Sequence, residues 1–368
     1  MKVESISIQN FKRFDNLEVS FKNKTLNEVS DRFLILGDNG SGKTTLLQAI
    51  ALPLALATGQ IQSVFNFDWI GFLPGRYSRW GSAPRIELEV SFEDEELEAT
   101  REVAQKWYDA QPEEFQNDFI VPGKSPVVRV ILNGENWKAG ETQAERLQFR
   151  GRSYAQWLVR NSDFSARSYF AKLPGIFWFD QFRNLGFNYN QDGTVDGTKE
   201  HNSGISYERG VGSLRKYLIE WRRKQEGGKN YQNDYLEQLE KYYKKVFPDR
   251  SFWGLENRPS LDSPTEETTY FLIKDDGNRR YDIEEMSAGE QSVFPILYEF
   301  VTLKIAYSVV LIDEIDLNLH PPAAQILVSQ LLTIAPTCQF IITTHSESVS
   351  NVIGESDTYR LPGGILCL

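Results

Sequence analysis

The stretch "RFLILGDNGSGKTTLLQAI", residues 32–50, decides the fold. An apolar run, "RFLIL", enters a glycine-rich segment, and a helix-like run follows it. Residues 37–44 match the phosphate-loop pattern G-x-x-x-x-G-K-[ST] at every position, between the strand and the helix that the pattern requires. Main-chain N–H groups of such a loop and the start of the following helix form a cradle for phosphate groups. The sequence therefore predicts a nucleotide-binding site in an α/β domain.

Within this loop the residues have separate predicted roles. Lys43 would reach the terminal phosphates, and the Thr44 hydroxyl would bind Mg²⁺. The other loop residues predicted to contact the nucleotide are Asp38, Asn39, Gly40, Ser41, Gly42 and Thr45.

Three further apolar runs resemble the one that precedes the loop, at residues 175–179, 308–313 and 338–343. Continuous apolar runs are typical of parallel strands that are buried on both faces. Together the four runs predict a parallel core sheet. Residues 3–21 instead alternate between apolar and polar, which predicts half-buried strands at the N-terminus.

The apolar run at 308–313 leads into carboxylates in the stretch "SVVLIDEIDLNLHP". These are Asp313 and Glu314. Behind a phosphate loop, such an aspartate holds the Mg²⁺ shell, and the next glutamate can accept a proton from an attacking water. The run "FIITTHS" ends similarly at His345, and "EEMSAGEQS", residues 284–292, predicts a helix start with Ser287 as its N-cap.

In this order, the four motifs resemble the ABC-type ATPase domain. The long spacing from the phosphate loop to "MSAGEQ", the form "DEIDLNLHP" and the opening "ISIQNFKRF" are similar to the group that includes RecF, SMC-type and OLD-family ATPases rather than to transporter subunits. The resemblance implies an ABC-type P-loop NTPase of the α/β class. Its core sheet would be mixed or parallel, with antiparallel N-terminal strands and an enlarged, inserted α-helical lobe. It also implies hydrolysis of ATP with Mg²⁺.

The resemblance assigns roles by position. Lys43, Thr44 and Asp313 would bind Mg-ATP, Glu314 would polarise the water, and His345 would be a switch at the γ-phosphate. The signature residues would contact the nucleotide of a second subunit; they are Ser287, Ala288, Gly289 and Glu290.

Two assignments stay open. The glutamine that reaches Mg²⁺ is expected at Gln181, after a buried strand, with Gln60 and Gln62 as rivals nearer to the phosphate loop. Arg13 is expected near the nucleotide, or else as a solvated turn residue.

The expected domain organisation has three parts. Residues 1–180 would form the N-terminal part of the ATPase lobe, with inserted strands and helices at about 60–172. Residues 181–285 would form an inserted helical lobe and a hairpin, and residues 286–368 would form the C-terminal part of the ATPase lobe.

Charge and composition limit the function classes. A net charge of −11 opposes constitutive binding to a polyanion, and no apolar run is long enough to span a membrane, so we expect a cytoplasmic protein without a membrane partner. Long coiled-coil arms and a Toprim nuclease domain are not expected either. The first hypothesis is an ATP-bound homodimer, or a higher assembly, that controls a separate effector such as a nuclease in antiviral defence, as Septu-like or retron-associated ATPases do. The alternative is a RecF- or SMC-like ATPase of DNA repair or chromosome maintenance, and an ABC transporter subunit ranks behind both.

A predicted helix with many basic residues is a candidate for binding nucleic acid. The candidate patch consists of Arg215, Lys216, Arg222, Arg223 and Lys224. Basic side chains around Trp221 suit nucleic acid, whereas balance by Glu220 and Glu226 would make them an ordinary solvated helix face.

Overall fold

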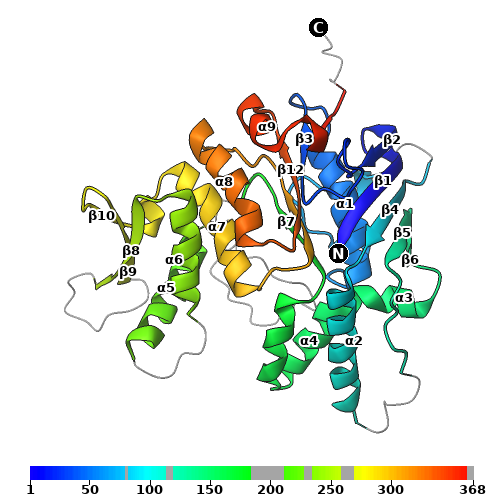
Figure 1. Ribbon diagram of the computed structural model, residues 1–368, viewed down its shortest axis with the longest axis horizontal. Coiled ribbons are helices and arrows are strands. Elements are labelled where there is room, and N and C mark those ends of the chain that lie inside the picture. The colour runs from blue at the N-terminus through cyan, green and yellow to red at the C-terminus, as the bar shows by residue number, and fades with distance from the viewer. Residues whose placement is uncertain (79–81, 113–118, 184–210, 228–233, 258–268, 363–368) are drawn as a thin grey trace.

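A parallel sheet forms the centre of the computed structural model, which describes residues 1–78, 82–112, 119–183, 211–227, 234–257 and 269–362 (Figure 1). Its five strands lie in the order β13-β3-β12-β11-β7. Their bounds are β3 (Arg32–Leu36), β7 (Gly175–Phe179), β11 (Ser308–Ile312), β12 (Gln339–Thr344) and β13 (Thr358–Arg360). All described pairings among them are parallel, so the predicted core sheet is confirmed. The short strand β13 was not expected.

Both faces of this sheet are buried, as the continuous apolar runs predict. On β11, Val309 and Leu311 belong to one hydrophobic core, whereas Val310 and Ile312 belong to another on the opposite face. Successive residues of a strand point to opposite faces, so each apolar run supplies both cores.

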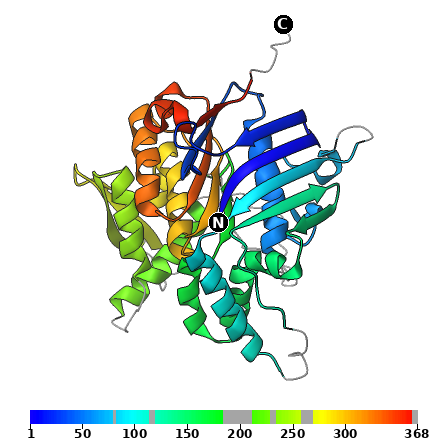
Figure 2. The ribbon, with the colours of Figure 1, turned by 45° about the vertical axis from the view of Figure 1, so that its right-hand side comes forward.

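The first core contains helix α1 (Lys43–Thr58), which follows the phosphate loop. The helix continues through Pro53, and its residues from Leu46 to Thr58 are buried. An antiparallel sheet covers its other side, in the order β2-β1-β4-β5-β6 (Figure 2). The bounds of these strands are β1 (Lys2–Phe11), β2 (Phe14–Ser20), β4 (Arg85–Ser91), β5 (Val127–Asn133) and β6 (Asn136–Ala139).

The segment expected as an insertion at about 60–172 contributes to two parts of the structure. Its strands β4 to β6 extend the N-terminal sheet, because β4 pairs along the length of β1. Its helices α2 (Asp94–Asp109) and α4 (Gly151–Arg160) pack together below both sheets around Val103, Ala155 and Leu158 (Figure 1). The short helix α3 (Gln143–Leu147) lies between β6 and α4 along the chain.

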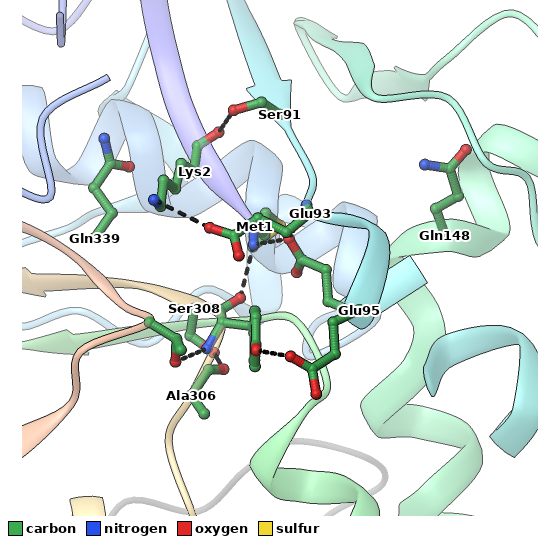
Figure 3. Close-up of polar contacts among 12 residues, drawn as sticks. Met1, Lys2, Ser91, Glu93, Glu95, Gln148, Ala306, Ser308 and Gln339 are labelled. Atoms are coloured by element: carbon green, nitrogen blue, oxygen red, sulfur yellow. Dashed lines mark hydrogen bonds and ion pairs between the residues drawn. The ribbon is translucent and has the colours of Figure 1, made fainter. Parts of the chain in front are cut away.

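A buried polar cluster joins β1, α2 and the start of β11. The Met1 amino group pairs with the Glu96 carboxylate and donates a hydrogen bond to the Tyr307 carbonyl, and burial lowers the pKa of this amine. Figure 3 shows Met1 and Lys2 beside Glu93 and Glu95 at the beginning of α2. Lys2 pairs with Glu93 at 3.2 Å. These bonds hold the helical pair to the core.

The second core contains the remaining elements, on the left in Figure 1. Helices α5 (Val211–Glu226) and α6 (Tyr235–Val246) pack with an antiparallel sheet of β8 (Arg250–Asn257), β9 (Thr269–Asp275) and β10 (Arg280–Asp282). The hairpin predicted between the last two strands is confirmed. We call this unit, residues 211–282 as far as they are described, the inserted lobe.

Helix α7 (Ala288–Thr302) leads from the inserted lobe back to the core sheet, followed by α8 (Pro321–Ile334) and α9 (Glu347–Ile353). Short 3-10 helices occupy Val64–Asn66, Pro74–Arg76, Gln148–Arg150, Phe164–Ala171, Ile283–Glu285 and Glu355–Asp357. The expected α/β class, with antiparallel N-terminal strands and an inserted lobe, is confirmed. The domain boundaries at residues 180 and 285 stay a prediction. Within the described part of the chain, no helix is both long and apolar enough to cross a bilayer.

Candidate functional site

The phosphate loop connects the carboxyl end of β3 to the first residue of α1. Gly40 and Gly42 have φ angles of 76° and 105°, a left-handed conformation that glycine adopts without steric cost. The Lys43 side chain folds back over the loop, where Nζ donates hydrogen bonds to the carbonyls of Gly37 at 2.8 Å and Asp38 at 3.1 Å. The lysine therefore lies over the same loop whose N–H groups would face an anion.

Two local observations fit a phosphate chain at this loop. The buried Ser41 hydroxyl oxygen has no hydrogen-bond partner among the described residues, and a buried polar atom without a partner is costly. A Cβ added to Gly40 would meet nothing within 4 Å, so open space lies beside the loop. That space leaves room for a phosphate group beside the loop.

Next to the loop, a chain of hydrogen bonds links three neighbouring elements. The Thr44 hydroxyl donates to one carboxylate oxygen of the fully buried Asp313 at 2.6 Å, and the Thr343 hydroxyl donates to the other at 2.6 Å. The Glu314 N–H in turn donates to the Thr343 hydroxyl at 2.8 Å. The predicted Mg²⁺ residues Thr44 and Asp313 are thus already in contact, beside the main chain of the predicted base.

Thr343 lies inside the run "FIITTHS", but only His345 of that run is predicted to have a role at the site. It is the last residue but one of β12, and it is fully buried. A pair of threonines that ends an otherwise apolar strand, just before His345, is the signal that could have identified it.

The signature motif forms the start of α7. Ser287 is its N-cap and forms a capping box with Glu290, as predicted. Ser287 and Ala288 are exposed, and Gly289 is half-buried. A Cβ on Gly289 would lie 2.9 Å from the Asn318 carbonyl oxygen, so glycine is needed here for the close approach to the loop after Glu314.

Glu290 does not lie on that exposed surface, contrary to its expected contact with a second subunit. Its carboxylate is buried and accepts hydrogen bonds from Tyr243 at 2.7 Å, Tyr281 at 2.9 Å and Arg250 at 3.2 Å, as well as from Ser287. Burial alone would raise the pKa of Glu290, but the hydrogen bonds from Ser287 and the two tyrosines outweigh it, so the pKa is lowered. Glu290 therefore connects the signature to the inserted lobe.

Comparisons with known proteins agree with this arrangement. Residues 1–119 match the family model described as "AAA ATPase domain", and residues 189–351 match the one described as "AAA domain, putative AbiEii toxin, Type IV TA system". The chain is 23% identical to the "Retron Vc95 probable ATPase" of Vibrio cholerae over 96% of its length and 72% of that protein. It is also 23% identical to the "Septu protein PtuA" of Bacillus mycoides, over 94% of the chain but only 38% of that protein.

The fold is also similar to that of a solved structure. The SMC head bound to the C-winged helix domain of ScpA superposes with a TM-score of 0.50 at 15% identity, covering 96% of this chain and 92% of that one. The two AAA models and the retron relative support an ATPase, and its fold is that of an SMC head.

In this ATPase, Gln181 lies at the same edge of the sheet as Asp313. Gln181 follows β7, next to β11, where the Asp313 N–H donates to the Phe179 carbonyl at 2.9 Å. Gln60 instead follows the far end of α1 and donates to the Ile176 carbonyl at 2.7 Å, near the start of β7, and Gln62 lies beside it in sequence. The placement favours Gln181 over both rivals, although its role stays a prediction.

His345 and Arg13 flank the loop and the strand ends. His345 is exposed directly after β12, which runs parallel to β11 and so ends at the same edge as Glu314. Arg13 packs against the phosphate loop, since a Cβ added to Gly42 would lie 2.6 Å from its Cδ. The structure therefore brings Arg13 to the loop rather than leaving it in a remote turn.

The candidate nucleic-acid patch of the ATPase lies on α5, where several basic side chains have acidic partners. Arg215 pairs with Asp282 at 3.3 Å, Arg222 pairs with Glu226 at 2.9 Å, and Lys224 pairs with Glu220. Further, the Arg223 guanidinium donates to the Thr269 hydroxyl at 3.1 Å, and Trp221 is buried against Tyr298. These contacts favour the balanced helix face, and binding of nucleic acid stays a prediction.

Proposed function

We propose that this ATPase works as a switch, in which two subunits close around bound ATP and hydrolysis lets them open, and that the switch controls a separate effector in antiviral defence. The observation that carries the proposal is the start of α7, which presents Ser287 and Ala288 outward at a helix N-terminus. A helix N-terminus is suited to bind phosphate. Because this helix N-terminus is exposed and lies beside the ATPase site, it supports contact with a nucleotide on another subunit.

Each residue at the sheet edge has a definable task in hydrolysis. Thr44 and Asp313 would hold Mg²⁺, which when bound neutralises charge that develops on the phosphates. Lys43 is close enough to exchange its two carbonyl partners for phosphate oxygens. Glu314 would accept the proton of the attacking water, since its side chain is only half-buried while its main chain is fixed by Thr343.

The symmetry of the proposed pair follows from its contacts. If the signature of one subunit completes the site of the other, the interface is isologous and holds two composite sites. Nucleotide bound at each composite site would then stabilise the closed pair, which is the behaviour of a switch. The relatives in retron and Septu systems support a role in defence, and a nuclease or similar protein would be the effector.

Glu314→Gln tests the switch. The variant should bind ATP normally, hydrolyse it at least about 100-fold more slowly because the proton acceptor is lost, and accumulate as a dimer. Size-exclusion chromatography with light scattering, with and without Mg-ATP, measures the dimer, and phosphate release measures the rate. Normal turnover by this variant would exclude Glu314 as the base.

Glu347→Gln provides the matched control. Glu347 begins α9 two residues after His345, and its exposed carboxylate pairs with Arg360 at 3.4 Å. The same chemical change there should leave hydrolysis and assembly as in the wild type. For the effector, the Glu314→Gln protein should be expressed from its native operon and purified with ATP, and mass spectrometry should identify what remains bound.

A further inference from the structure

Arg183 is a fully enclosed cation beside the candidate site, and none of the sequence motifs includes it. It follows β7, and only 3% of its surface is exposed. Burial lowers the pKa of Arg183 to about 10, although the nearby carboxylates, Asp313 foremost, counteract that shift. A buried guanidinium of this kind must be compensated by well-placed acceptors.

The acceptors are main-chain carbonyl oxygens from three different elements. Nη1 donates to Asp313 at 2.8 Å and to Asp180 at 3.2 Å, and Nη2 donates to Glu314 at 3.1 Å. Nε donates to Ser292 of α7 at 2.9 Å. One side chain thereby joins the end of β7, the end of β11 and the signature helix.

Glu314 needs such support because its backbone is strained. Its φ angle is 47°, in the left-handed region, which is sterically unfavourable for a residue with a Cβ. A strained conformation persists only where the surroundings impose it. Here the Glu314 N–H is held by Thr343 and its carbonyl by Arg183, so both main-chain groups are fixed.

We propose that Arg183 is a positioning residue for hydrolysis, which holds the main chain of Glu314 in its left-handed conformation and ties it to the signature helix α7. This inference rests on the proposed role of Glu314. It extends that role, because the residue that sets the direction of the base also contacts the helix whose first residues face a second subunit.

The chemistry of the guanidinium explains why another cation would not serve. The guanidinium is a planar group with five N–H donors, and here it donates four N–H···O hydrogen bonds. A lysine has three donors on one atom, so at least one of the four carbonyls would lose its partner. In Arg183→Lys we expect Glu314 to shift while the phosphate loop, which Arg183 does not contact, keeps its shape.

The test separates catalysis from binding. Arg183→Lys should lower kcat about 10- to 100-fold, as expected for a misplaced catalytic group, while the Kd for a fluorescent ATP analogue changes less than about threefold. In a Glu314→Gln background, the same change should slow hydrolysis no further, because both act on one group.

Arg152→Lys is the matched control. Arg152 is also buried and also donates to three carbonyls, those of Phe170, Leu303 and Lys304, at 3.0–3.1 Å. It packs on Gly175 at the amino end of β7, opposite the carboxyl end that Arg183 follows. The Arg152→Lys variant should lower the melting temperature about as much as Arg183→Lys does, and it should leave kcat unchanged.

The following outcomes would overturn the inference. Unchanged kcat in Arg183→Lys, or an equal loss of kcat, ATP binding and melting temperature in both arginine variants, would make Arg183 a structural residue only. If the lysine variant does not fold, the neutral Arg183→Gln replaces it and is read in the same way; failure of both to fold would also overturn the inference. Normal turnover in Glu314→Gln alone would instead contradict the proposed function.

Discussion

The two halves of the candidate site are built differently. At the sheet edge, the polar groups bond to one another within the core: Thr44 to Asp313, and Thr343 to both Asp313 and Glu314. At the start of α7, the polar groups bond away from the core to the inserted lobe, and Ser287 and Ala288 stay exposed. The first half is held together within the core, whereas the second has exposed residues and is bonded to the inserted lobe. In the proposed switch, the second half would contact a neighbouring subunit.

The two halves also need glycine for different reasons. Gly40 in the phosphate loop needs no space, since a Cβ there would meet nothing within 4 Å, but its φ angle of 76° requires glycine. Gly289 at the start of α7 needs space instead, because a Cβ would lie 2.9 Å from the Asn318 carbonyl oxygen. One half depends on a backbone conformation and the other on close packing.

The largest predicted effect concerns complementation between subunits. Lys43→Ala should abolish nucleotide binding, and Ala288→Glu should abolish closure because its carboxylate would face a partner's phosphates; each alone should lose about 100-fold or more of the ATPase rate. A glutamate is favourable in the first turn of a helix, so Ala288→Glu should fold normally. An equimolar mixture should recover roughly a quarter of the wild-type rate, because half of the pairs would contain one intact composite site.

Phosphate release by the mixture, compared with each variant alone, measures this recovery. Ala288→Gln, which has the same size without the charge, is the control and should retain most of the activity. A mixture that is no faster than the sum of its parts would mean that both halves of the site act within one subunit.

The second prediction concerns the link between the signature and the inserted lobe. Glu290→Gln replaces a buried carboxylate that accepts from two tyrosines, an arginine and Ser287, so the free energy of unfolding should fall by about 2 kcal/mol. Because the pKa of Glu290 is lowered in the folded protein, its contribution is present above the ordinary value of 4.5 and is lost as the pH falls through the lowered pKa.

Urea unfolding of wild type and variant at pH 7 and near pH 4 measures both effects. The difference between the two proteins should be largest at pH 7 and smaller in acid. Glu226→Gln, which removes an exposed partner of Arg222, should change the stability little at either pH. Equal stability of Glu290→Gln and wild type at pH 7 would remove the proposed coupling.

Sequence patterns predicted the sheet edge better than the start of α7, for a physical reason. Strand runs and a phosphate loop are local patterns, and parallel strands bring their carboxyl ends together, so Lys43, Thr44, Asp313 and Glu314 could be placed in advance. The partners of Glu290 come from α6, β8 and β10, and those of Arg183 from β7, β11 and α7. Such contacts depend on long-range packing that no local period contains.

The same limit explains the sheet β2-β1-β4-β5-β6. Inserted strands are predicted at about 60–172, but their pairing with β1 depends on a register between segments about eighty residues apart, as between Ile8 and Ile86. In the structure, these strands complete the sheet that covers α1.

The smallest predicted effect separates the two glycine requirements. Gly40→Ala should weaken ATP binding by single subunits about five- to tenfold, since the left-handed conformation costs a residue with a Cβ roughly 1 kcal/mol or more. Gly289→Ala should leave that binding unchanged and weaken only ATP-dependent dimerisation, because its Cβ would displace the start of α7 from Asn318. Fluorescent ATP titration at low protein concentration and light scattering measure the two steps separately. If Gly289→Ala weakened ATP binding by single subunits as much as Gly40→Ala, the signature would belong to the same half of the site as the phosphate loop.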